Sequence, residues 1–268
     1  MRTIVHLSDL HFGRLDERIL APLVERITAI QPDVIAVSGD FTQRARRHQF
    51  QQARAFLDRL PFSALAVPGN HDVPAFNLAA RLLNPFGGYR RWINADLEPA
   101  RVDDEIALIG LNSARALILG GRGRLNIEQI DAAVARLQPL PPALIKVIVT
   151  HHPFDLPEGF PDGHLVGRAA LAMQRFAEAG ADLFLAGHLH VSHVGHTADR
   201  YNIAGHSALV VQAGTLSTRG RGELNTFNVL RIARPEMAVE RYSWESGSQT
   251  FDRSFGGTFR HTPDGWTA

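Results

Sequence analysis

Apolar residues along the first two thirds of the chain follow two different spacings. Short apolar or β-branched runs that end at turn residues predict buried strands. Between these runs, apolar residues recur every three or four positions, which predicts amphipathic helices. The predicted strands are 3–7, 34–37, 63–67, 106–111, 144–149 and 182–186. The predicted helices are 15–30, 45–60, 75–83, 126–137 and 167–179.

The helical spacing disappears in the last third of the chain. Alternation of apolar and polar residues there predicts strands with one buried face, at 191–196, 208–213, 227–232 and 237–242. Strand–helix alternation followed by strands alone predicts a single α/β domain over residues 1–245, whose second half adds antiparallel strands. Residues 246–268 are rich in Gly, Ser and Thr. We interpret them as a tail that packs on the domain or lies at the interface of a homodimer.

Composition excludes several classes of protein. The chain has 268 residues and no cysteine, so disulfides and cysteine-based zinc sites are excluded and any metal must have N and O ligands. The net charge of +1 gives no bulk electrostatic case for a nucleic-acid partner, which we therefore do not expect. No apolar run is long enough for a membrane span and the N-terminus does not resemble a signal peptide, so we expect a cytoplasmic protein.

Polar chemistry gathers where predicted strands end. Gly69-Asn70-His71-Asp72 closely follows the strand 63–67, and Gly69 is expected to allow a sharp turn. In α/β sheets, ligands bind beyond the carboxyl ends of the strands, and five predicted strands deliver Asp, Asn or His to that edge. The side chains concerned are Asp9 and His11; Asp40; Asn70, His71 and Asp72; His151; His188 and His190.

The number of these side chains is too large for one tetrahedral ion. It suits two ions roughly 3.5–4 Å apart that share one carboxylate. Asp40 stands alone at its strand end and is the natural bridge. Nitrogen and oxygen ligands without sulfur suit Mn, Fe or Zn.

Five motifs in this order resemble the calcineurin-like metallophosphoesterase superfamily. The resemblance implies a four-layer αββα sandwich of two mixed sheets flanked by helices, with a dinuclear metal centre. It assigns His71 as an outer-sphere acid and Asp72 as the carboxylate that orients it. The motifs are Asp9-Leu10-His11, Gly39-Asp40, Gly69-Asn70-His71-Asp72, His151-His152-Pro153 and Gly187-His188-Leu189-His190. The implied ligands are Asp9, His11, Asp40 and His190 for one ion, and Asp40, Asn70, His151 and His188 for the other.

A narrower resemblance points to bacterial class III cyclic nucleotide phosphodiesterases. It is carried by His6–Gly13, Gln212–Thr215 and Arg221–Glu223. It favours a phosphodiesterase that hydrolyses a small phosphodiester, with 3',5'-cyclic nucleotides as candidates, through attack by a metal-bridged hydroxide. A phosphomonoesterase, a nuclease and a non-catalytic scaffold are the alternatives, and the sequence assigns no substrate-binding residue.

Some individual residues keep two interpretations. Asp72 suits a cap or turn role as well as the orientation of His71. The cluster 44–47 is interpreted as the solvated start of a helix rather than as a phosphate site. Arg81, Arg90 and Arg91 lie in an irregular segment where a substrate cap would be, and both packing and substrate contact stay open for them. His152 is interpreted as a packed histidine.

Overall fold

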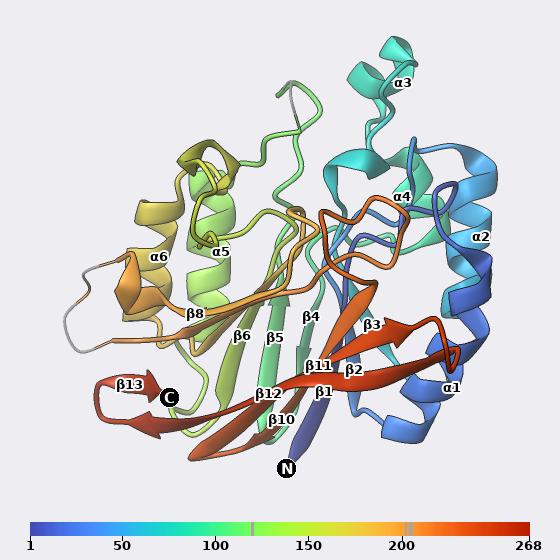
Figure 1. Ribbon diagram of the computed structural model, residues 1–268. Coiled ribbons are helices and arrows are strands. Elements are labelled where there is room, and N and C mark those ends of the chain that lie inside the picture. Colours follow the sequence, from blue (N-terminus) through green and yellow to red (C-terminus); the bar gives the residue numbers. More distant parts are fainter. Residues whose placement is uncertain (119–120, 202, 204–205) are drawn as a thin grey trace.

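The strands form two mixed sheets that lie face to face, with helices on both outer sides (Figure 1). The computed structural model describes residues 1–118, 121–201, 203 and 206–268. Its four layers are those of the α/β sandwich that the sequence predicts, so the predicted fold class is confirmed. None of the helices within the described residues has the length and apolar character of a transmembrane span.

The first sheet has seven strands in the order β13-β12-β11-β10-β1-β2-β3. The strands β1, β2 and β3 are parallel, and β10 to β13 add to them in antiparallel fashion. Most of the stretch interpreted as a tail forms β12 and β13 of this sheet. The strands are β1 (Arg2–Leu7), β2 (Val34–Val37), β3 (Ala64–Ala66), β10 (Thr226–Ala233), β11 (Glu236–Glu245), β12 (Thr250–Thr262) and β13 (Gly265–Thr267).

The second sheet has six strands in the order β4-β5-β6-β7-β9-β8. Its four inner strands are parallel, and the two edge strands are antiparallel to them. The strands are β4 (Ala100–Val102), β5 (Ile106–Gly110), β6 (Ile145–Val149), β7 (Leu183–Ala186), β8 (His193–His196) and β9 (Leu209–Gln212).

The helices separate by sheet, apart from one that projects outward. The first sheet is covered by α1 (Leu20–Ile30), α2 (Arg47–Leu57) and α4 (Gly87–Trp92). The second is covered by α5 (Ile127–Leu137) and α6 (Ala169–Glu178). The short helix α3 (Leu78–Leu83) stands away from the body of the molecule (Figure 1). Short 3-10 turns lie at Glu17–Ile19, Asn70–Asp72, Asp162–His164 and Thr197–Asp199.

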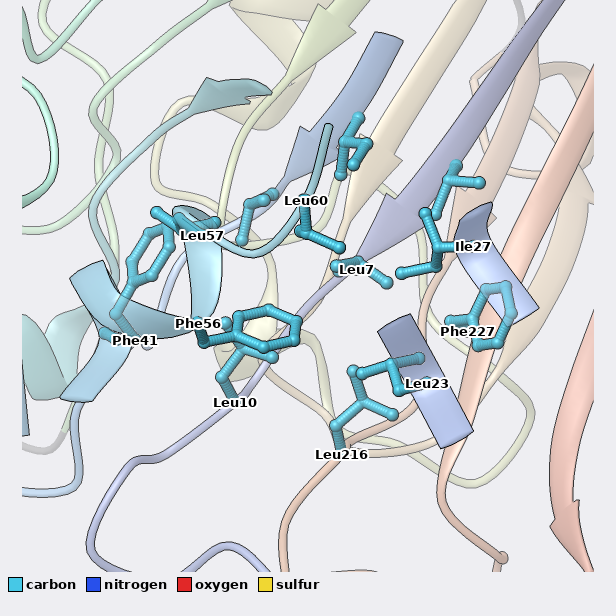
Figure 2. Packing of buried hydrophobic residues seen from close by; sticks show 14 of the residues in the cluster. Leu7, Leu10, Leu23, Ile27, Phe41, Phe56, Leu57, Leu60, Leu216 and Phe227 are labelled. Carbon is cyan, nitrogen blue, oxygen red and sulfur yellow. The ribbon is translucent and has the colours of Figure 1, made fainter. Parts of the chain in front are cut away.

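Alternation along the central strands builds the core on both sides of each sheet. In β1, Val5 and Leu7 face the helical layer, whereas Ile4 faces the other sheet. Figure 2 shows Leu7 near Ile27 of α1, in the same cluster as Leu23. Burial on both faces explains why these strands are almost continuously apolar, and why they stop at a polar residue only where they leave the sandwich.

Candidate metal centre

The loops after β1, β2 and β7 hold their side chains with an unusual backbone. Positive φ angles occur at Asp9 (53°), His11 (45°), Asp40 (54°), His188 (75°) and His190 (58°). The left-handed region is unfavourable for residues with a Cβ, and such strain is concentrated at functional sites. All five are strand-end residues predicted from the sequence, so the strain directs the predicted ligands toward a common point.

One cluster joins a carboxylate to two imidazoles. The Asp9 Oδ1 atom lies 3.1 Å from His190 Nε2 and 3.4 Å from His11 Nε2. The two Nε2 atoms are themselves 3.1 Å apart. All three residues are buried.

The other cluster gathers around the Asn70 amide. The Asn70 Oδ1 atom lies 3.1 Å from His151 Nε2 and 3.2 Å from His188 Nδ1. Asp40 lies between the two clusters, because its Oδ2 atom is 3.4 Å from His151 Nε2 and 3.6 Å from His11 Nε2. The structure thus brings together all seven side chains that the sequence proposes as ligands.

The surroundings of these side chains suit metal cations. Asp9 Oδ1 is buried and has no hydrogen-bond donor within the described residues, which is unfavourable unless a cation is present. Its Oδ2 atom accepts from Ser8 Oγ at 2.6 Å and from the His188 backbone N–H at 2.9 Å. His151 Nδ1 lies 2.8 Å from the Ser38 carbonyl oxygen, which leaves Nε2 free to face the centre. The donor set therefore fits N/O-ligated ions.

The two carboxylates are ionised despite their burial. Burial raises the pKa of Asp9, but the neighbouring His190 and His11 outweigh it and lower the pKa. Burial likewise opposes ionisation of Asp40, and His151 outweighs it, so the pKa of Asp40 is also lowered. Burial alone would lower the pKa of His151, but the Asp40 carboxylate raises it to about 9. The site therefore presents fixed negative charge in its interior.

His71 lies beside the ligands without belonging to either cluster. Its Nδ1 atom is 2.9 Å from the Gln43 carbonyl oxygen, and its Nε2 atom is 2.9 Å from a guanidinium nitrogen of Arg219. Its backbone N–H donates to Asp40 Oδ1 at 2.8 Å. Burial lowers the pKa of His71 below its usual value, and the opposing effect of the Asp40 charge is smaller. The ring lines the cavity, which is where an acid would have to lie. The acid role of His71 stays a prediction.

The carboxylate of Asp72 forms its hydrogen bonds with groups other than the His71 ring. Its carboxylate accepts from the backbone N–H groups of Gly69 at 3.0 Å and Thr42 at 2.9 Å. Burial and the nearby Asp40 raise the pKa of Asp72 to about 7. These contacts correspond to the turn role that the sequence left open for Asp72. The contact expected to orient His71 is made by the Gln43 carbonyl instead.

Gly69 and His152 also have defined roles. The φ angle of Gly69 is −104°, which any residue adopts, so a sharp turn is not what requires glycine. A Cβ atom there would lie 2.1 Å from Asp40 Oδ1, so glycine is needed for close approach. His152 is packed as predicted, with Nδ1 2.8 Å from Ser113 Oγ and Nε2 2.8 Å from the Gly121 carbonyl oxygen.

The clusters form the floor of a cavity of about 480 Å³ whose walls are rich in arginine. Arg219 reaches furthest in, with a guanidinium nitrogen 3.3 Å from His11 Nε2. The sequence offers the stretch 214–225 as a candidate wall of the site without singling out Arg219, which lies there in the loop after β9, another parallel strand of the second sheet. The arginines lining the cavity are Arg44, Arg81, Arg115, Arg219 and Arg221.

Comparison with known families agrees with the motif pattern. The model of the calcineurin-like phosphoesterase family matches residues 2–192. The chain belongs to the calcineurin-like phosphoesterase family. Its members are metal-dependent phosphoric ester hydrolases, and the predicted superfamily is thus confirmed.

Individual relatives match only in part. Over 80 residues the chain is 31% identical to the glycerophosphodiester phosphodiesterase GpdQ of Enterobacter lignolyticus, covering 26% of this chain and 29% of that protein. Over 76 residues it is 32% identical to the UDP-2,3-diacylglucosamine pyrophosphatase LpxG of Chlamydia trachomatis, covering 27% of this chain and 23% of that protein. The chain thus matches less than a third of the length of either curated relative.

A solved structure shows the shared fold over nearly the whole chain. A dimetal phosphatase from Danio rerio superposes with a TM-score of 0.67 at 12% identity, covering 97% of this chain and 99% of that one. At this identity the likeness shows the fold alone.

Proposed function

We propose that the protein is a phosphodiesterase that needs two metal ions (Mn, Fe or Zn) and hydrolyses a small phosphodiester, with 3',5'-cyclic nucleotides as candidate substrates. The observation that carries the proposal is the pair of ligand clusters joined by Asp40 beneath the cavity. Asp9, His11 and His190 would hold one ion, and Asp40 would contribute to both. Asn70, His151 and His188 would hold the other. When bound, such ions would activate a water molecule and neutralise charge on the phosphate.

The chain's own residues supply the remaining chemistry. The Arg219 guanidinium projects toward the floor of the cavity, and its fork of N–H donors suits two phosphate oxygens. His71 Nε2 faces the same space; it accepts from the Arg219 guanidinium in this structure, and in the protonated ring it would give a proton to the leaving oxygen. Gln43 fixes the ring, because its carbonyl accepts the Nδ1 proton and keeps Nε2 toward the cavity.

The choice of a diester rests on two observations. The name of GpdQ is that of a phosphodiesterase, and its matched segment supports the same class here. The cavity of about 480 Å³ leaves space for a second substituent on the phosphate. The five arginines on its walls favour a phosphomonoesterase as the second candidate, because a monoester carries more negative charge.

The alternative of a non-catalytic scaffold has less support. All seven proposed ligands and His71 are present and face one cavity or cluster. A homodimer and a cyclic nucleotide substrate stay predictions.

One experiment tests the proposal. The purified protein is analysed for bound metal, and kcat/KM is measured for bis-nitrophenyl phosphate, nitrophenyl phosphate, cyclic AMP and single-stranded DNA under one metal condition. We expect about two ions per chain and a clear preference for the diester. A preference for nitrophenyl phosphate would contradict the proposed diesterase activity and favour the phosphomonoesterase. Diester turnover without any turnover of cyclic AMP would remove cyclic AMP as the substrate.

A further inference from the structure

A second cavity of about 530 Å³ adjoins the cavity above the metal centre. The two share Arg44 and Ala75 in their walls, so they are neighbours along one face of the molecule. The second cavity opens to solvent and is lined by the start of α2, the segment 74–77, and residues of α3 and α4. Figure 1 shows these elements together on the side of the first sheet, beneath the projecting α3. We call it the arginine cavity.

Every charged residue that lines the arginine cavity is basic, and the rest of its wall is mostly apolar. Four arginines line it, Arg44, Arg46, Arg47 and Arg91, and none of its described lining residues is acidic. None of these four forms an ion pair with a carboxylate in the described part of the chain. By contrast, Arg54 on the same helix α2 pairs with Asp58 at 2.8 Å. The charge in this cavity is therefore available to a ligand, although the net charge of the chain is only +1.

Two of the guanidinium groups lie over aromatic rings. Arg44 lies over the Phe76 ring at 5.0 Å, and Arg91 lies over the Trp92 ring at 5.6 Å. A cation–π contact of this kind attracts a guanidinium to the ring while its N–H groups can still bind an anion. Phe76 is 74% exposed, so its position on this wall is not explained by burial in the core.

Local stability does not account for the arginines at the start of α2. Positive side chains at a helix N-terminus oppose the helix dipole. The cap is provided by Gln49, whose Oε1 atom accepts from the backbone N–H of Arg44 at 2.9 Å and of Arg46 at 3.4 Å. Arg44, Arg46 and Arg47 are exposed, as expected of a solvated helix start, and their guanidinium groups add charge to the cavity rather than stability to the helix.

We propose that the arginine cavity binds a second phosphate, carried by one of the two groups esterified to the reacting phosphate. The inference rests on the proposed phosphodiesterase function and specifies its substrate class. The substrate is a diester with an additional terminal phosphate, such as a dinucleotide phosphorylated at its 5' or 3' end. A diester with a single phosphate would leave this cavity without an anion.

The test compares three thymidine dinucleotides, which carry no terminal phosphate, a 5'-phosphate or a 3'-phosphate. In the unmodified protein, kcat/KM for one phosphorylated form should exceed that for the unphosphorylated form by about tenfold or more, mainly through KM. Arg91→Gln and Arg47→Gln should bring this ratio close to one. Arg90→Gln is the matched control, because Arg90 is exposed on the same helix as Arg91 and lines neither cavity. It should keep the ratio.

A binding measurement separates this inference from the proposed function. Calorimetric titration of the metal-loaded protein with the matching dinucleotides, in which a methylene group replaces the bridging oxygen of the leaving group to prevent turnover, should show tighter binding of a phosphorylated form and loss of that preference in Arg91→Gln. If no diester is hydrolysed but this preference is found, the arginine cavity stands and the phosphodiesterase proposal fails. If diesters are hydrolysed without preference for a terminal phosphate, or if the preference survives in both variants, the inference is overturned and the phosphodiesterase stands.

Discussion

A single methyl group at Gly69 should disable the metal centre by displacing Asp40. A Cβ atom at this position would lie 2.1 Å from Asp40 Oδ1 and 2.4 Å from the Asp40 backbone nitrogen. Van der Waals contact needs more than 3 Å or so, and the backbone nitrogen cannot rotate away as a side chain can. The backbone angles of Gly69 suit alanine, so the effect of Gly69→Ala is a matter of space rather than of conformation.

The size of the effect follows from the displacement. Asp40 must move by about 1 Å, several times the roughly 0.2 Å that a metal–ligand distance tolerates. Because Asp40 faces both clusters, we expect Gly69→Ala to lower the occupancy of both ions. Misplacement of this size costs about 10²-fold in rate. Overpacking should also cost about 1–3 kcal/mol in the free energy of unfolding.

The assay combines metal analysis of the purified variant with kcat/KM for bis-nitrophenyl phosphate and urea unfolding. Gly247→Ala is the control, since a Cβ atom there meets no atom within 4 Å. It should keep metal content and rate. Full metal occupancy with unchanged activity in Gly69→Ala would refute the reasoning, because Asp40 would then not be the shared ligand.

Three further predictions follow from other contacts. Asp40→Ala should lose both ions and Asn70→Ala mainly one, as measured by metal analysis; full occupancy in Asp40→Ala would remove the bridge. His71→Ala should keep its metal but lose about 10²–10⁴-fold in rate, and less for nitrophenyl than for alkyl diesters, because nitrophenolate needs little protonation; equal losses would count against the acid role. Asp155 accepts from Arg200 Nε at 2.7 Å, which together with His193 outweighs burial and lowers the pKa of Asp155. A depressed carboxylate pKa stabilises the fold above the unfolded value of about 4, so Arg200→Met should cost about 1–3 kcal/mol at neutral pH in urea unfolding, and the difference should shrink as the pH falls below about 4.

Sequence reasoning succeeded where one physical rule determined the outcome. Asp9, Asp40 and His151 follow parallel strands, whose carboxyl ends meet at one side of a sandwich, so their convergence could be predicted. Continuous apolar runs likewise predicted the buried strands, because both faces of each sheet are covered. The resemblance to the superfamily supplied the division into two sheets, which spacing alone does not contain.

What the sequence could not supply depends on contacts between distant segments. The Gln43 carbonyl, rather than Asp72, forms the hydrogen bond with His71 Nδ1. Every residue has a backbone carbonyl, so the residue type at position 43 does not indicate this contact. Arg219 reaches His11 only through the pairing of β9 with β7, which residue spacing does not reveal. By local pattern, the arginines at the start of α2 are ordinary surface residues. Only the structure shows that they line one cavity, which indicates a binding role.

The proposed ligands are divided between the two sheets of the sandwich. Asp9, His11, Asp40 and Asn70 follow strands of the first sheet, whereas His151, His188 and His190 follow strands of the second. His11 and His190 meet although 179 positions separate them in the chain. Ions bound there would crosslink the two sheets at one end of the sandwich. Neither sheet alone offers a complete set of ligands, so metal uptake would be among the last events of folding and would report that both halves have closed.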